Sequence, residues 1–164
     1  MRRRALSFTV AVVCLALGAS ACGGDDSDES SDASSAVIEQ IDGICTDWKQ
    51  ALDARGDFPV EGFDPENPSQ QDLPAVGDYF ASGHAAAEEA IANLRQLSPP
   101  ADIDAEVEAL ISALDQGLAS AKAQASAAQA GDVAAFTATL SDVASLQEAV
   151  EDAADELGVD SCAF

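Results

Sequence analysis

This sequence has little of the side-chain chemistry that catalysis and tight metal binding require. Its single histidine is His84, and its single methionine is Met1, which a cleaved leader would remove. A haem held between helices needs paired axial ligands, so that cofactor is excluded. No Gly-x-Ser-x-Gly motif is present to place a serine nucleophile beside a base. These absences predict a protein that is not an enzyme and carries no cofactor.

His84 and Glu88 are the best candidates for metal ligands, because residues four apart share one helix face. Two ligands are too few for a tight transition-metal site, and no Glu-x-x-His pair of the di-iron bundle type occurs. His84 also falls on the apolar seam of its predicted helix, between Phe80 and Ala87. We therefore interpret His84 as a partly buried structural residue and predict no metal site.

Basic residues are also scarce, with 7 Lys and Arg against 30 Asp and Glu. Three of the seven are the arginines at positions 2–4, so the chain from Cys22 onward has a formal charge of about −26. Such a surface repels phosphate backbones, which excludes nucleic acid as a partner. The simplest interpretation is that the acidity keeps an alanine-rich protein soluble, although cations or a basic protein remain electrostatically allowed.

Residues 1–21 have the pattern of a secretion signal rather than of a fold element. A positive start is followed by an apolar stretch over residues 5–17 and then by small residues before Cys22. The segment resembles a bacterial lipoprotein signal, with Ala19-Ser20-Ala21-Cys22 in the place of the lipobox, although leucine is the commoner residue where Ala19 stands. We therefore expect Cys22 to carry a diacylglyceryl group that anchors the chain to the outer face of the cytoplasmic membrane.

Two further cysteines remain after Cys14 is discarded with the signal and Cys22 takes the lipid. Cys45 and Cys162 form a single pair, and disulfides persist in the oxidising space outside the cell. The sequence therefore predicts a Cys45–Cys162 disulfide. Two unpaired thiols are the alternative, and a two-cysteine metal site would lack further ligands.

Residues 23–35 are rich in Gly, Ser, Asp and Glu and have no apolar periodicity, which predicts a disordered acidic tether. Residues 36–164 are expected to form the folded domain, in which four amphipathic segments alternate with turn signals. Residues 57–71 are expected to be an acidic loop. The segments begin at Ser35, Asp72, Asp102 and Asp132 as helix caps, and they end at Arg55-Gly56, Ser98-Pro99-Pro100, Gly131 and Gly158.

Four such helices without a strand-like run predict an all-α fold, an antiparallel up-down four-helix bundle. In that topology the start of the first helix lies beside the end of the fourth, where a disulfide between Cys45 and Cys162 can form. A three-helix bundle with one helix split is the alternative. Trp48 and Tyr79 are expected to fill the core.

The region from Cys22 onward resembles the small secreted or lipid-anchored helical proteins common in high-GC Gram-positive bacteria. The resemblance implies a helical fold and an extracytoplasmic address, and it implies no activity. It rests on three short motifs, which are Leu94-x-x-Leu97-x-Pro99-Pro100, Ala130-Gly131-Asp132 and Leu157-Gly158-x-x-x-Cys162.

These features predict a lipid-anchored, non-enzymatic binding or scaffold protein of the cell envelope, with an unidentified envelope protein as a partner. The alternative is a carrier of a small ligand or cation that uses the bundle interior, near His84, or the acidic loop. A third hypothesis is a hydrolase acting through paired carboxylates on one helix face, such as Asp104 and Glu108.

Overall fold

The computed structural model describes residues 26–163, and every regular element in that range is a helix. The predicted all-α class is therefore confirmed, whereas the predicted signal and Cys22 lie outside the described residues. None of the helices in this range combines the length and the apolar character needed to cross a bilayer. The elements are α1 (Asp26–Asp53), α2 (Leu73–Ser82), α3 (His84–Leu94), α4 (Asp104–Gln129), α5 (Val133–Ala138), α6 (Leu140–Leu157) and the short 3₁₀ helix η1 (Asp160–Cys162).

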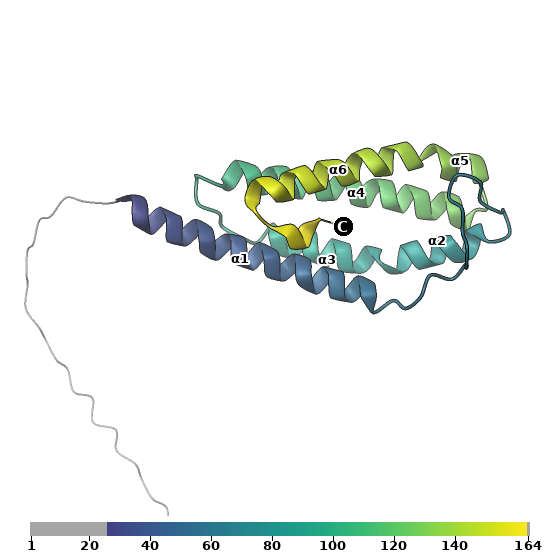
Figure 1. The fold of residues 1–164 in the computed structure, drawn as a ribbon, viewed down its shortest axis with the longest axis horizontal. Coiled ribbons are helices and arrows are strands. Elements are labelled where there is room, and N and C mark those ends of the chain that lie inside the picture. Colours follow the sequence, from purple (N-terminus) through teal and green to yellow (C-terminus); the bar gives the residue numbers. More distant parts are fainter. Residues whose placement is uncertain (1–25, 164) are drawn as a thin grey trace, which may run out of the picture.

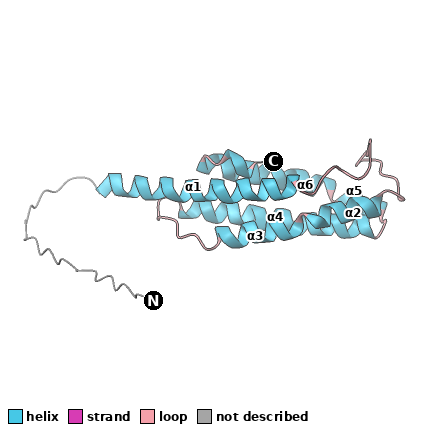
Figure 2. Ribbon diagram, turned by 90° about the horizontal axis from the view of Figure 1, so that it is seen from below, coloured by secondary structure: helices cyan, strands magenta, loops and turns pink. Residues whose placement is uncertain are grey.

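Helix α4 is the centre of the molecule, because it packs against α2, α3, α5 and α6. Helix α1 packs against α3, and η1 lies against both α1 and α6. The long helices lie side by side along the long axis of the molecule, as two perpendicular views show (Figures 1 and 2). This arrangement leaves the space enclosed by α1, α3, α4 and α6 as the interior of the fold.

Helix α1 begins at Asp26, nine residues before the predicted cap at Ser35, so the expected disorder of residues 26–35 is wrong. Ser35 is an interior residue of α1, and its hydroxyl donates to the carbonyl of Ser31 at 2.9 Å. Ser34 is buried, and its hydroxyl donates to the carboxylate of Asp102 at 2.8 Å. This contact with the start of α4 is long-range, which is why local composition did not reveal it. The carboxylate of Asp102 therefore accepts a hydrogen bond from Ser34 and does not cap α4, which starts at Asp104.

The predicted second helix is divided into α2 and α3 at Gly83. A Cβ atom at Gly83 would lie 2.7 Å from Nη1 of Arg55 and 3.0 Å from a methyl group of Leu52, so glycine lets the end of α1 approach. The break frees the carbonyl of Tyr79, which accepts hydrogen bonds from Ser82 Oγ at 2.6 Å and from Arg55 Nη1 at 3.5 Å. These bonds satisfy a polar group that an uninterrupted helix would have paired internally.

The predicted fourth helix is also divided, at Thr139, where the hydroxyl donates a hydrogen bond to the carbonyl of Phe136 at 2.7 Å.

Two predicted caps are confirmed. Asp132 accepts a hydrogen bond from the backbone N–H of Ala135 at 2.9 Å, and Gly158 has the left-handed φ of 72° that ends α6. Asp72 stands directly before α2 but makes no capping hydrogen bond with its side chain.

The interior contains two apolar clusters. The larger joins α1, α3, α4, α6 and η1, and the smaller joins α2, α4 and α5 with the predicted acidic loop. The loop is confirmed as non-helical, and it contributes Val60 and Phe63 to the smaller cluster. Trp48 packs against the larger cluster, and Tyr79 is half-buried beneath the guanidinium of Arg55, 4.6 Å from the ring centroid.

The disulfide between Cys45 and Cys162 is present, with 5.0 Å between the two Cα atoms. Both residues are fully buried, as is Val159 in the turn between α6 and η1. Ser161 adds a hydrogen bond from its hydroxyl to the carbonyl of Asp42 at 3.1 Å. The chain after α6 therefore folds back and is attached to the side of α1.

Candidate functional site

A pocket of about 230 Å³ lies in the space enclosed by four helices. Its volume exceeds that of an engineered cavity of about 150 Å³ that binds benzene in another protein. None of its lining side chains is charged. The lining residues are Trp48 of α1, Ala87 of α3, Leu114, Gly117 and Leu118 of α4, and Val143, Leu146, Gln147 and Val150 of α6.

Small residues open this pocket at the level where large side chains would otherwise meet. Ala87 and Gly117 are the two smallest residues of the lining, and a Cβ atom added to Gly117 would meet nothing within 4 Å. Leu114 and Val150 belong to the buried part of the larger apolar cluster, and Trp48 and Leu118 pack at its edge. The pocket is therefore an extension of the core that the side chains leave unfilled.

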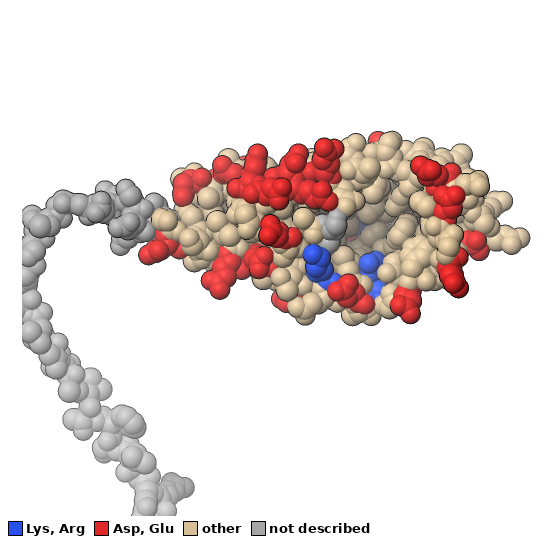
Figure 3. Space-filling view, viewed as in Figure 1, with Lys and Arg blue, Asp and Glu red and all other residues tan. Residues whose placement is uncertain are grey.

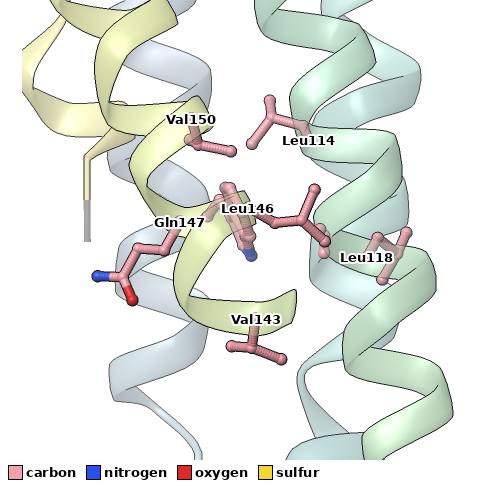
Figure 4. A pocket seen from close by; sticks show the side chains of 9 residues that line it. Leu114, Leu118, Val143, Leu146, Gln147 and Val150 are labelled. Carbon is pink, nitrogen blue, oxygen red and sulfur yellow. The ribbon is translucent and has the colours of Figure 1, made fainter. Parts of the chain in front are cut away.

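The apolar side chains converge, whereas the amide of Gln147 lies at the outer edge. Val150 of α6 and Leu114 of α4 point toward each other, and the Gln147 amide is turned away from Leu118 (Figure 4). Gln147 is exposed, and its Nε2 donates to a carboxylate oxygen of Glu151 at 3.2 Å. Besides Gln147, only Trp48 contributes a side-chain polar atom to the lining, its indole nitrogen. The pocket thus has an apolar interior and a polar edge.

The surface is hollowed between α1 and α6 on the face that shows both helices (Figure 3). Acidic side chains gather along α6 outside this hollow (Figure 3). Lys49, which follows Trp48 in α1, donates from Nζ to the carbonyl of Ala163 at 3.3 Å and so holds the chain end after η1 to α1. Basic side chains lie beside this hollow in the same view, and the acidic ones lie further along α6, around an uncharged pocket (Figure 3).

His84 is the first residue of α3 and is half-buried, as the sequence predicted. Its Nε2 atom is fully buried and has no hydrogen-bond partner among the described residues. Burial lowers the pKa of the His84 imidazole, and the nearby charge of Lys122 lowers it further, while the carbonyl of Ala121 and the carboxylate of Glu88 act in the opposite direction. Neutral imidazole is therefore the favoured form inside the fold.

Glu88 pairs with Lys122 of α4 in an exposed ion pair. The hydrogen bond and the charge of Lys122 lower the pKa of the Glu88 carboxyl. No group of three or more His, Cys, Asp or Glu side chains in the described part of the chain is placed to hold a metal ion. His84 and Glu88 share a helix face as the spacing predicted, and the side chain nearest in charge to both is Lys122 of α4, which is not a metal ligand.

The residues that line the pocket were only partly predictable from the sequence. Leu114, Leu118, Val143, Leu146 and Val150 belong to stripes that the spacing predicts as core, and nothing in those stripes marks an unfilled space. The one available signal is Gly117 between two large apolar residues of a helix, because glycine is otherwise unfavourable there. His84, near which the carrier hypothesis places a cavity, does not line the pocket, which is reached one helical turn further along α3 at Ala87.

Comparison with known proteins finds no matching family model, and no curated protein or solved structure matches the chain significantly.

Proposed function

We propose that this chain is a lipid-anchored binding protein of the cell envelope that takes a small apolar ligand into the pocket between α1, α3, α4 and α6. The observation that carries the proposal is an uncharged pocket of about 230 Å³ in a fold that has large, well-packed apolar clusters on either side. The pocket is open to solvent, and a concave, mostly apolar lining with a few polar groups is typical of sites that bind small molecules. The protein is not an enzyme in this proposal.

The anchor in this proposal is the thiol of Cys22, with residues 1–21 removed as a signal. Two acyl chains on one cysteine give stable attachment, where one chain would be marginal. Helix α1 begins at Asp26, only four residues after Cys22, so the connection between lipid and fold is shorter than a tether ending at Ser35. The pocket would then be carried on the outer face of the cytoplasmic membrane.

The topology in this proposal is the antiparallel up-down four-helix bundle. Helices α2 and α3 count as one interrupted helix, as do α5 and α6, because a single residue separates the members of each pair. Packing of α1 on α3, α3 on α4 and α4 on α6 is in keeping with neighbours in sequence being neighbours in space. The disulfide and η1 supply the remaining link, from the end of α6 back to α1.

Pocket binding is tested by filling the space. In Gly117→Leu, a leucine side chain enters the pocket from α4, and the added Cβ atom itself meets no clash. The matched control is Gly43→Leu, because Gly43 is a helical glycine of α1 with open space around it and lies outside the pocket. The full chain from residue 22 is used with Cys22→Ser, which needs no detergent that would compete for the site.

The ligand probe is N-phenyl-1-naphthylamine, a neutral apolar dye whose fluorescence rises on transfer from water. We expect saturable binding to the reference chain and to Gly43→Leu, and loss of binding in Gly117→Leu. Equal binding by all three proteins would place the dye elsewhere and overturn the pocket as the ligand site. No saturable binding by any of them would also reject the proposal.

The anchor is tested separately by growing the producing cells with labelled palmitate. We expect label in the wild-type protein and none in Cys22→Ala, with the unlabelled variant released from the membrane fraction. Label that persists after Cys22→Ala would reject Cys22 as the site of lipid attachment.

A further inference from the structure

We infer that the ligand of the pocket is a neutral, unbranched, single-chain molecule with one small hydrogen-bonding end, of the chemical class of a medium-chain alcohol. This inference rests on the proposed binding function and specifies its ligand. Three observations carry it, namely the uncharged lining, the position of its polar atoms, and the acidic surface outside it.

The uncharged lining excludes an ionised group from the interior. None of the nine residues that enclose the pocket is Asp, Glu, Lys, Arg or His. A charge moved from water into such a site would have no partner, and its desolvation would be costly. A ligand that fits the whole pocket must therefore be neutral within it.

The distribution of polar atoms indicates how the ligand is oriented. The lining atoms contributed by Leu114, Leu146 and Val150 are hydrocarbon, and the polar side-chain atoms of the lining are the amide of Gln147 and the buried indole nitrogen of Trp48. The exposed amide of Gln147 marks the outer edge (Figure 4), where its Nε2 already donates a hydrogen bond to the carboxylate of Glu151. An amide is both donor and acceptor, so it suits a hydroxyl, which has the same dual capacity. The hydroxyl end therefore lies at Gln147 and the chain extends inward.

The size of the pocket limits the length of the chain. A volume of about 230 Å³ corresponds to roughly seven or eight groups the size of a water molecule, taking about 30 Å³ for each. A methylene group is similar in size to a water molecule. A chain of roughly seven carbons with a hydroxyl therefore fills the pocket, and a longer chain would extend into the hollow between α1 and α6.

The net negative charge of the protein disfavours a carboxylate and an alkylammonium ion as ligands for different reasons. A chain with 30 acidic residues against 7 basic ones repels a carboxylate as it approaches. It attracts an alkylammonium ion, whose charge would remain at the surface near carboxylates such as Glu151 and would not fill the pocket. A neutral alcohol avoids both effects and can place its chain in the pocket with its hydroxyl at the edge.

The test compares 1-heptanol, heptanoate and heptylammonium, which share one chain and differ in the terminal group. The protein is the chain from residue 22 with Cys22→Ser, and fluorescence of Trp48 on the pocket wall reports binding, since this residue is the only tryptophan. At neutral pH we expect 1-heptanol to bind at least about tenfold more tightly than heptanoate and heptylammonium, because burying an unpaired charge is costly. Gly117→Leu should abolish the response to 1-heptanol.

The position of the polar end is tested with Gln147→Leu and with heptane as the chain without a hydroxyl. We expect Gln147→Leu to weaken 1-heptanol roughly three- to tenfold, the value of one hydrogen bond, and to leave heptane unchanged or slightly stronger. An equal effect on both molecules would show that Gln147 acts only by shape, which would overturn the orientation. Ser145→Leu, an exposed α6 position outside the lining, serves as the control.

The outcomes separate the two proposals. Equally tight binding of heptanoate or heptylammonium, still abolished by Gly117→Leu, would overturn the ligand class and keep the pocket as a binding site. Absence of binding by all four probes, together with no saturable binding of the naphthylamine dye, would reject the binding function itself.

Discussion

Cys45 and Cys162 are 117 residues apart in the sequence and are joined in the structure, with both side chains inaccessible to solvent. Their bond attaches the segment after α6 to the C-terminal third of α1. Because η1 contacts both α1 and α6, this bond connects the first and last long helices around the pocket. The covalent link and the pocket therefore belong to the same part of the fold.

Removing the disulfide should destabilise the protein strongly. For Cys45→Ala together with Cys162→Ala, we expect the free energy of unfolding to fall by roughly 4–5 kcal/mol, since closure of so long a loop restricts the unfolded chain. Urea unfolding followed by circular dichroism measures the change. A loss below about 1 kcal/mol would mean that packing of Val159 and η1 against α1 holds the ends together without the bond.

Gly77 should not tolerate a methyl group, whereas Gly43 should benefit from one. A Cβ atom at Gly77 would lie 2.6 Å from the backbone nitrogen of Gln129 and 2.8 Å from the carbonyl oxygen of Ala125, both rigid parts of α4. We expect Gly77→Ala to cost about 1–3 kcal/mol, because α2 and α4 must move apart. Gly43→Ala should stabilise by about 0.5–1 kcal/mol through helix propensity. Thermal unfolding of the two variants compares them, and a destabilisation of similar size in both would contradict the close α2–α4 contact.

Asp132 and Asp72 make a matched pair of predicted helix caps. Only Asp132 accepts a hydrogen bond from the backbone of its helix, so Asp132→Ala should cost about 0.5–2 kcal/mol. Asp72→Ala should change stability by less than about 0.5 kcal/mol, because the Asp72 side chain makes no capping bond. Chemical denaturation of both variants under one set of conditions decides between them. If Asp72→Ala costs as much as Asp132→Ala, capping is not the cause.

His84 should make stability depend on pH near neutrality. Its pKa in the folded protein is below the ordinary value of 6.5, chiefly because burial disfavours the charged imidazolium. Both states hold neutral imidazole above pH 6.5, so the full stability is present there; it falls as the pH drops below 6.5, because the unfolded chain binds the proton more readily.

The measurement is urea unfolding from about pH 8 to about pH 5 for the wild type and His84→Gln, which lacks the titrating group. We expect the wild type to lose more stability than the variant as the pH is lowered, while the carboxylates contribute equally to both. Titration of the imidazole by nuclear magnetic resonance should give a midpoint below 6.5. A midpoint at or above that value would contradict the burial of Nε2.

The parts of the fold that depend on local chemistry were predictable from the sequence. Asp132 caps a helix and Gly158 ends one, because each acts on backbone groups within its own turn. The disulfide followed from counting the cysteines that remain in a chain predicted to be exported. The breaks at Gly83 and Thr139 were not predictable, because the apolar spacing continues through both, and at Gly83 the end of another helix decides the outcome.

The start of α1 at Asp26 and the pocket were also not predictable from local sequence. Residues 26–35 carry no apolar stripe. The hydrogen bond from Ser34 to Asp102, which is distant in the sequence, connects this part of α1 to the start of α4. Gly117 lies in a helix that the sequence predicts well. The pocket beside it, however, depends on where α6 and Trp48 of α1 lie relative to α4.

By itself, the sequence determined that the domain from residue 36 onward would be helical, acidic and closed by one disulfide, because spacing, charge and cysteine number are local or additive properties. Only the tertiary structure decided where α2 and α5 end, how far α1 extends, and which side chains enclose an unfilled space. Those features depend on distances between helices, and such distances are set by the simultaneous packing of side chains that are far apart in the chain.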